Sequence, residues 1–473
     1  MISYRSFFIV IYLVLSVLLF LTFNSSLIIW TSFLGSATIL LLITIYHLYF
    51  EVKYSPFLSS YIVFNFLFFI AAPISQINSF SDLNTARFTN FFHFKEGLVL
   101  YANILISIFN VLFICTYIQL KKKVSFKEEI TIKDSIKKYL PIILVILLLI
   151  SLITFFISFS FIKEEFTNPN WLKSDNTSKS MLLIWKKFLF MVPFAGLILC
   201  YSYFKKSNKL KNNLNFIIFF FVTFLFLLFW FKNPLTEKRN ALGPIYLSLL
   251  FLFKPKILNS NLKTLSFLFF SMIIVFPLMA IVTHADATLG EILNSPMILI
   301  REMKGGGITE AFNTLNYDAF SNIMVSIEWV QKNGFSYGYQ FLGGLFFFLP
   351  RSIWVSKPYS SGQLIGEYLI DDYGFNFTNL SNPLVSESFI NFGIIGVILT
   401  PLVLAYVTII MLKWLHLGSF QKKIIAFYFS MHLLFLLRGD FTNGFAYFIG
   451  PFLAVVALPK IISLFVKAFL KKQ

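Results

Sequence analysis

The chain has 473 residues, of which 58% are hydrophobic and only 13% are charged, and its formal net charge is +18. A soluble protein of this length cannot bury so much apolar surface, so lipid must solvate much of the chain. This excludes an ordinary soluble domain. The lysines lie in short connections between apolar stretches, so we interpret the positive charge as a topology signal and exclude nucleic-acid binding.

Apolar stretches recur along the whole chain, and about 20 such residues are enough for a helix to cross roughly 30 Å of hydrocarbon. Twelve of them predict membrane spans: 6–23, 27–46, 56–74, 98–118, 140–161, 185–204, 216–231, 241–253, 264–283, 386–412, 424–437 and 443–459. We therefore predict an all-α polytopic membrane protein in which residues 1–473 form one integral membrane domain.

The lysine-rich connections predict the orientation of these spans. They are 121–138, 205–211, 254–263, 413–423 and the 467–472 tail. Alternating the twelve spans places all of them on one side, which the Lys/Arg excess of short cytoplasmic loops identifies as the inner side. Both termini are then cytoplasmic. Richness in Phe, Ile, Lys and Asn suggests the coding bias of a low-GC bacterium, and we expect the protein in a bacterial plasma membrane. Cys115 and Cys200 fall inside spans, where we expect packing residues rather than a disulfide or a metal pair.

A loop of about one hundred residues, 284–385, interrupts the pattern between spans nine and ten and lies on the outer side in this topology. It mixes apolar, aromatic and charged residues with glycine turn signals, so we expect it to fold. Apolar residues at helical spacing between Asp318 and Lys332 predict an interfacial helix. The apolar stretch 341–350 is too short to span and predicts a half-buried or re-entrant segment.

Arginine is distributed differently from lysine. Of six arginines only Arg5 is on the predicted inner side; the others are Arg87, Arg239, Arg301, Arg351 and Arg438. Because guanidinium binds phosphate through two parallel hydrogen bonds, this distribution predicts cations that hold an anionic lipid at the outer surface. Anchoring to lipid headgroups, or ion pairing with Glu237 or Asp440, is the structural alternative.

Glu387 is the outer acid that stands at the water–lipid boundary, since it opens the tenth span. Partial desolvation there favours a general base, although an acid at a helix N-terminus is also explained by the helix dipole. Aromatic residues crowd the outer loop and predict either sugar stacking or an interfacial aromatic belt. They are Trp329, Tyr337, Tyr339, Trp354, Tyr359, Tyr368 and Tyr373.

Four segments, in the outer loop and at the start of the tenth span, together carry a resemblance to a known family. They are Tyr317-Asp318-Ala319-Phe320, Tyr337-Gly338-Tyr339, Leu349-Pro350-Arg351-Ser352-Ile353-Trp354 with Lys357-Pro358, and Ser386-Glu387-Ser388-Phe389-Ile390-Asn391-Phe392-Gly393-Ile394-Ile395-Gly396. Together with Glu237-Lys238-Arg239-Asn240, they resemble the oligosaccharide repeat-unit polymerases, the Wzy-type O-antigen polymerases. The resemblance covers mainly residues 235–450. An Arg-x10-Gly pattern of some members occurs once, from Arg351 to Gly362, and its second copy is missing.

The resemblance implies a GT-C-like membrane fold and an inverting glycosyl transfer, without metal or cofactor, between two undecaprenyl-diphosphate-linked oligosaccharides. In this hypothesis Glu387 is the base, and Arg239, Arg351 and Arg438 hold the diphosphate, with Arg301 and Lys357 as further members. Trp354, Tyr339, Tyr359 and Asp318 would bind sugar. The expected partners are the lipid-linked oligosaccharides, membrane lipid and a chain-length regulator protein.

Three other functions remain open. An O-antigen ligase shares this architecture and is expected to use a histidine of the large loop, where His284 is the candidate. A flippase or exporter of lipid-linked oligosaccharide would need ionisable groups at mid-membrane, where His432 is nearly the only one. A transferase that uses polyprenyl-monophosphate sugars typically has an acidic pair in the first outer loop, and residues 23–27 contain no acid.

The predicted topology can be tested by cysteine labelling in a background without Cys115 and Cys200. We expect Ser352→Cys, in the large loop, to react with a membrane-impermeant maleimide added to intact spheroplasts. We expect Ser419→Cys, in a lysine-rich connection, to react only after permeabilisation. The opposite order of labelling would place the large loop in the cytosol.

Overall fold

The computed structural model describes residues 4–78, 87–126, 139–167, 184–206, 214–234, 237, 239–275 and 312–470. Within these ranges every regular element is a helix, apart from one isolated bridge between Arg87 and His93. Ten helices are long and apolar enough to cross a membrane, so the chain is a multi-pass membrane protein. The predicted span 241–253 corresponds to the short apolar helix Ala241–Phe253. The predicted span 264–283 begins within the short apolar helix Asn261–Ile273, and its residues 276–283 lie outside the described residues.

The helices of the first half begin and end close to the predicted spans. They are α1 (Tyr4–Leu21), α2 (Leu27–Ile45) with η1 (Tyr46–Phe50), α3 (Pro56–Phe66) with η2 (Leu67–Ala71) and α4 (Ala72–Asn78), α5 (Glu96–Lys123), α7 (Leu140–Thr167), η4 (Leu189–Met191), α9 (Val192–Lys206), α10 (Leu214–Phe231), α11 (Arg239–Phe253), η5 (Pro255–Ile257), α12 (Asn261–Phe270) and η6 (Ser271–Val275). The segment α3–α4 is buried throughout and forms the centre of the bundle.

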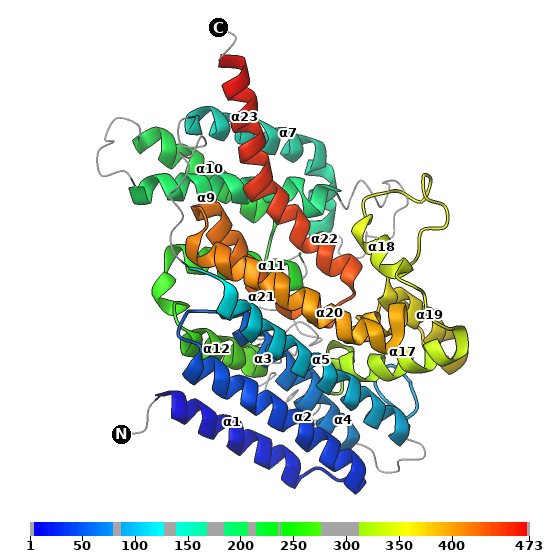
Figure 1. The fold of residues 1–473 in the computed structure, drawn as a ribbon. Helices are drawn as coiled ribbons and strands as arrows, with labels where there is room; N and C mark the ends of the chain where they lie inside the picture. Colours follow the sequence, from blue (N-terminus) through cyan, green and yellow to red (C-terminus); the bar gives the residue numbers. More distant parts are fainter. Residues whose placement is uncertain are drawn as a thin grey trace, which may run out of the picture.

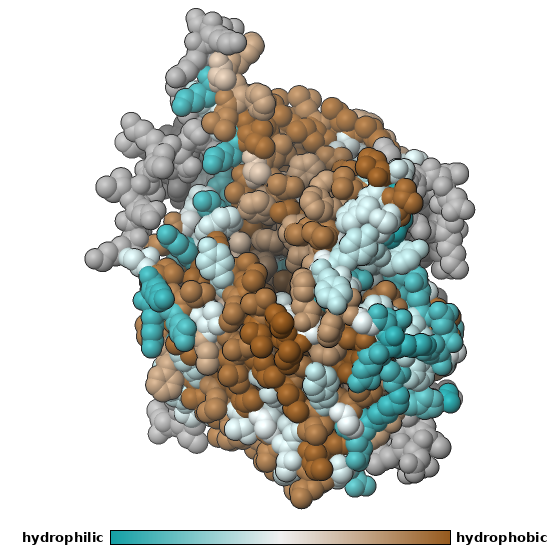
Figure 2. Space-filling view, turned by 45° about the vertical axis from the view of Figure 1, so that its right-hand side comes forward, coloured by the Kyte–Doolittle hydropathy of each residue, from teal (hydrophilic) through white to brown (hydrophobic). Residues whose placement is uncertain are grey.

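The second half begins with the described part of the large loop. Its helices are η7 (Leu315–Tyr317), α17 (Ala319–Asn333), α18 (Tyr339–Leu345), α19 (Ser361–Tyr373), α20 (Leu384–Leu417), α21 (Phe420–Arg438), α22 (Phe441–Phe452), η8 (Leu453–Ala457) and α23 (Leu458–Leu470). Figure 1 shows α17, α18 and α19 together at the right-hand end of the bundle, while α7, α9, α10 and α23 lie above α20 and α21. Figure 2 shows apolar residues over most of one face, with hydrophilic residues at its lower right and along its left edge.

The helix predicted in the large loop is present as α17. An interfacial helix would expose its polar face to water, but α17 does not. Its polar residues are buried together with its apolar ones from Ala319 to Ile327. Asn322 donates to the carbonyl of Ser381 at 2.6 Å, and Ser386 of α20 bonds the hydroxyl of Ser326 at 2.5 Å. The large loop therefore packs onto the start of α20 through polar contacts.

A buried polar cluster around Glu51 joins several spans at the end of the bundle opposite the large loop. Glu51, fully buried after η1, accepts hydrogen bonds from Tyr117 at 2.6 Å and Lys121 at 2.5 Å, and lies 2.6 Å from His47. Asn261 donates to the Glu51 carbonyl at 3.1 Å. Burial alone would raise the pKa of Glu51, but His47 and Lys121 hold it below its ordinary value. The ends of α2 and α5 and the start of α12 therefore meet.

The glycines of the Ser386–Gly396 segment produce a kink that the sequence did not predict. Phe392 and Gly393 leave the helical conformation inside α20, and Gly393 has φ +59°, which favours glycine. A Cβ at Gly396 would overlap the Ser388 carbonyl. The kink separates the first turns of α20, which carry Glu387, from the long apolar remainder of the helix.

We expect Glu51→Gln to lower the free energy of unfolding by on the order of 3 kcal/mol, because Lys121 and His47 then lose their buried counter-charge. The measurement is thermal or denaturant unfolding of the purified protein in detergent. Glu96→Gln, at an exposed position in the first turn of α5, is the matched control and should change stability by less than about 0.5 kcal/mol. Equal stability of the two variants would contradict a structural role for the Glu51 cluster.

Candidate functional site

Glu387 lies at the junction of α20, α22 and α19 and is fully buried. Its Oε2 accepts a hydrogen bond from the backbone N–H of Phe441 at 2.5 Å, at the positive end of the α22 dipole. Its Oε1 makes no hydrogen bond to any part of the chain that the structure describes. Ser361, in the first turn of α19, and Asp440 both act on this carboxyl group. Glu387 therefore has one anchored oxygen and one that can accept a proton.

Asp440 is a second buried acid beside Glu387. It caps α22 by accepting hydrogen bonds from the Asn443 backbone N–H at 2.7 Å and its side-chain amide at 3.1 Å. Burial raises the pKa of Asp440, although the Asn443 contacts and Lys187 act in the opposite direction. α19 can lie close to Leu380 and Asp440 because residue 362 is glycine. A Cβ there would overlap the Leu380 carbonyl and lie 3.2 Å from Asp440 Oδ2.

Arg438 pairs with Asp318, and not with the alternatives Glu237 or Asp440. Its guanidinium lies 3.6 Å from Asp318 Oδ1 and donates to the Leu315 carbonyl at 3.1 Å. Asp318 is 1% exposed. Burial raises the pKa of Asp318 from 3.8 to about 6, even though Arg438 acts in the opposite direction. This ion pair attaches the start of α17 to the end of α21, and both side chains are engaged within the protein.

Arg351 and Lys357 bind carbonyl groups of their own loop. Arg351 donates to the carbonyls of Lys357 and Pro358 and lies 4.3 Å from the centroid of the Tyr359 ring. The Lys357 ammonium donates to the Phe347 and Leu349 carbonyls at 2.7 and 2.9 Å. Burial, and repulsion by Arg351, lower the pKa of Lys357. These two cations therefore close the loop after α18.

The aromatic residues predicted to bind sugar are part of the same loop. Tyr339 donates to the carbonyl and hydroxyl of Ser356, and its ring meets Trp354 edge-on at 5.9 Å. Tyr359 is 45% exposed. The loop reaches the acidic residues through α18, because Gly344 packs against Phe441 and Thr442 at the start of α22. Tyr339, Trp354 and Tyr359 thus form a partly exposed aromatic surface on an element that contacts α22.

The remaining predicted cations cannot be placed in this site. Arg239 begins α11, but its side chain lies outside the described part of the structure, and so does Arg301. Three buried groups near α22 were missed by the sequence prediction as site residues: Asp440, Ser361 and Lys187. Asp440 was considered only as a partner of Arg438. A helix N-cap pattern, Asp440 before Phe441-Thr442-Asn443, was the signal that could have identified its structural role.

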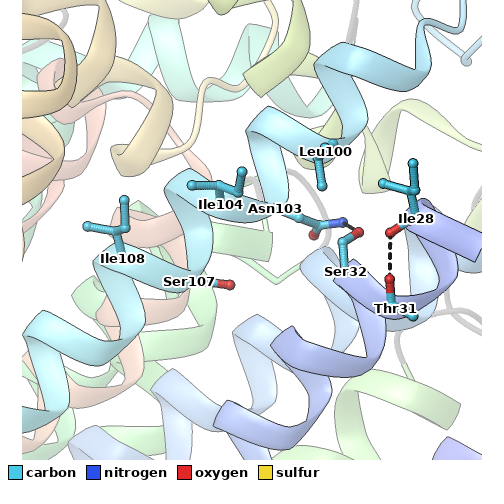
Figure 3. Close-up of a pocket in the computed structure, with 8 residues that line it drawn as sticks. All are labelled: Ile28, Thr31, Ser32, Leu100, Asn103, Ile104, Ser107 and Ile108. Atoms are coloured by element: carbon cyan, nitrogen blue, oxygen red, sulfur yellow. Dashed lines mark hydrogen bonds between the residues drawn. The ribbon is translucent and has the colours of Figure 1, made fainter.

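An open surface groove lies between α2 and α5 (Figure 3). It has a volume of about 400 Å³ and is lined by Ile28, Thr31, Ser32, Leu100, Asn103, Ile104, Ser107 and Ile108. The Asn103 amide donates to Ser32 at 2.9 Å at its base. Its lining residues belong to α2 and α5, whereas Glu387 belongs to α20.

Comparison of the chain with family models, with curated proteins and with solved structures gave no match.

The raised pKa of Asp318 predicts a pH-dependent stability. Between its ordinary value of 3.8 and about 6 the folded protein keeps a proton that the unfolded chain releases. Stability from this group is therefore complete at low pH and falls, by up to about 3 kcal/mol, as the pH rises through this window. Asp318→Asn removes the effect, so its melting temperature relative to wild type should rise between about pH 4 and about pH 7. A difference that stays constant with pH would contradict the shift.

Proposed function

We propose that the chain is a glycosyltransferase that joins undecaprenyl-diphosphate-linked oligosaccharide repeat units on the outer leaflet of a bacterial plasma membrane. The observation that carries the proposal is the convergence of the four segments on which the resemblance to Wzy-type polymerases rests. Glu387 is buried where they meet. A GT-C-like arrangement of the spans belongs to the same proposal.

Contacts link these segments, some of them directly and one through Arg438 and the start of α22. Asp318 of the first segment pairs with Arg438, which precedes the α22 N-terminus that anchors Glu387. In the second, Gly338 packs against the Phe392 ring of α20, and the neighbouring Ser336 bonds the Ile390 carbonyl at 2.9 Å. The third contacts the second through the rings of Trp354 and Tyr339, whose centroids are 5.9 Å apart. Residues separated along the chain are thus brought to one end of the bundle.

The proposed reaction assigns Glu387 the role of general base. The acceptor hydroxyl loses its proton to Oε1 while its oxygen attacks the anomeric carbon of the donor sugar. The bond between that carbon and the diphosphate oxygen breaks, and the diphosphate leaves with the bonding electrons. Nearby cations stabilise the charge that develops on it. Phe441 N–H keeps Oε2 in place during the transfer.

Access to Glu387 requires a movement, because its side chain is covered by the first turn of α19 and by the start of α22. α19 is also attached to α17 by contacts that do not involve Glu387. Tyr368 and Tyr373 of α19 donate hydrogen bonds to Glu328 of α17. A displacement of the Ser360–Gly362 turn would uncover the carboxylate while these contacts remain. Substrate binding is the event that would drive it.

We expect Glu387→Gln to abolish elongation of a defined lipid-linked repeat unit by the purified protein. The amide cannot take the proton, but it retains the length of the side chain and an acceptor for Phe441. Glu367→Gln, on the partly exposed part of α19, is the control and should keep at least about half of the activity. Expression in the membrane and melting temperature are measured for both variants.

The products distinguish the rival functions. Deletion of the gene should leave single-repeat glycans in place of a ladder of lengths. Loss of all attached glycan would favour a ligase, and movement of substrate across vesicles without elongation would favour a flippase. Normal polymer from Glu387→Gln would remove Glu387 from the mechanism.

A further inference from the structure

The groove between α2 and α5 carries polar groups on a surface that is otherwise apolar (Figure 3). Both helices are long and apolar enough to cross a membrane, so this surface faces hydrocarbon. Ile28 and Ile104, which line the groove, are 62% and 44% exposed. Lipid chains offer no hydrogen bonds, so lipid alone does not account for the polar residues that line the same groove: Thr31, Ser32, Asn103 and Ser107.

The side chain of Asn103 brings an acceptor without a donor to this groove. Asn103 is 1% exposed, and its amide nitrogen donates to Ser32 at 2.9 Å. Figure 3 shows the side chain extending from α5 toward α2. Its Oδ1 accepts no hydrogen bond from any residue that the structure describes. Because a buried acceptor without a donor is unfavourable, a donor brought into the groove by another protein chain would stabilise the assembly.

α2 presents small residues on the exposed face beside the groove. Thr31, Gly35 and Thr38 follow one another at spacings that place them on one face of the helix, and all three are exposed. No atom of the described residues lies within 4 Å of a Cβ built at Gly35. Small residues at this spacing let the backbones of two membrane helices approach closely. This face therefore fits a second transmembrane helix.

The same face of α2 carries hydroxyl donors that suit the Asn103 acceptor. Thr31 donates to the Leu27 carbonyl of its own helix at 2.8 Å. That carbonyl already accepts a backbone hydrogen bond, so the hydroxyl can turn to another acceptor without leaving an unsatisfied group. Copies of a membrane protein share one orientation, so a residue keeps its depth when two copies meet about an axis along the membrane normal. Thr31 and Asn103 line the same groove, so Thr31 of the partner subunit would enter it at the depth of Asn103.

We propose that this face is a homodimer interface, in which α2 packs against α2 of a second copy and each Thr31 hydroxyl donates to Asn103 Oδ1 of the other copy. The surface is self-complementary, because donor and acceptor both lie on it and a twofold axis forms the same bond twice. Gly35, between Thr31 and Thr38, is the point where the two backbones approach most closely. Glu387 is on another helix, so the interface goes beyond the proposed function and does not depend on it.

The test is self-association of the full-length protein in lipid vesicles, measured by energy transfer between two fluorophore labels as the protein-to-lipid ratio is varied. Wild type should fit a dimer. Gly35→Leu should raise the dissociation constant about tenfold or more, because the new side chain fills the space that the second helix needs. Gly243→Leu is the matched control and should associate like wild type, since no described atom lies within 4 Å of a Cβ at this glycine of α11 either.

The hydrogen bond can be tested separately from the close helix approach. Thr31→Val keeps the shape of the side chain but removes the donor, and it should weaken association about threefold. Thr31→Ser keeps the donor and should associate like wild type. Thr223→Val is the control, because Thr223 of α10 also donates to a carbonyl of its own helix, that of Phe219 at 2.8 Å. Equal association of the valine and serine variants at residue 31 would reject the Thr31–Asn103 bond.

Cross-linking locates the interface in the native membrane. In a background without Cys115 and Cys200, Gly35→Cys should form a disulfide-linked dimer on mild oxidation, because close helix packing brings the two thiols within bonding range. Leu149→Cys, at a position of α7 that is 53% exposed, should remain monomeric. The melting temperature of Gly35→Leu should match wild type, which separates lost association from unfolding. A monomer at every protein-to-lipid ratio would overturn the proposal, and so would a dimer that Gly35→Leu does not weaken.

Discussion

A charged side chain inside an apolar helix bundle needs a counter-charge or several hydrogen bonds, because hydrocarbon cannot replace its hydration. This requirement determines where distant parts of the chain meet. At one end of the bundle, Glu51 brings together α2, α5 and the start of α12. At the other, Arg438 and Asp318 join α21 to α17, and Glu387 meets the N-terminus of α22. The apolar helices pack between these two polar layers.

Hydropathy was sufficient to predict most of the helices from the sequence. Each predicted span overlaps a described helix, and the helix expected after Asp318 is α17. These features depend on local composition and spacing. The burial of Ser321, Asn322 and Ser326 was not predictable in this way, because it depends on the polar start of α20 that packs against them. The kink at Gly393 depends likewise on a close backbone approach.

The candidate site was predicted in part. Glu387 was predicted from its position at the start of a span, where a wet boundary was expected; in the structure it is buried against the N-terminus of α22. The arginines were predicted because guanidinium binds phosphate. An arginine that already pairs with an acid of the protein is less available to a ligand, and such ion pairs join residues far apart in the sequence. Arg438 and Asp318 form an ion pair although more than one hundred residues of sequence separate them.

The turn of α19 that covers Glu387 has a consequence for side reactions. An activated sugar can pass to water as well as to a sugar hydroxyl, and a base that can deprotonate one nucleophile can deprotonate the other. With Ser361 and Gly362 closed over the carboxylate, bulk solvent does not reach it. For the proposed transferase, this seal would keep hydrolysis of the donor slow until an acceptor glycan displaces the turn, so that growing chains are extended and not released.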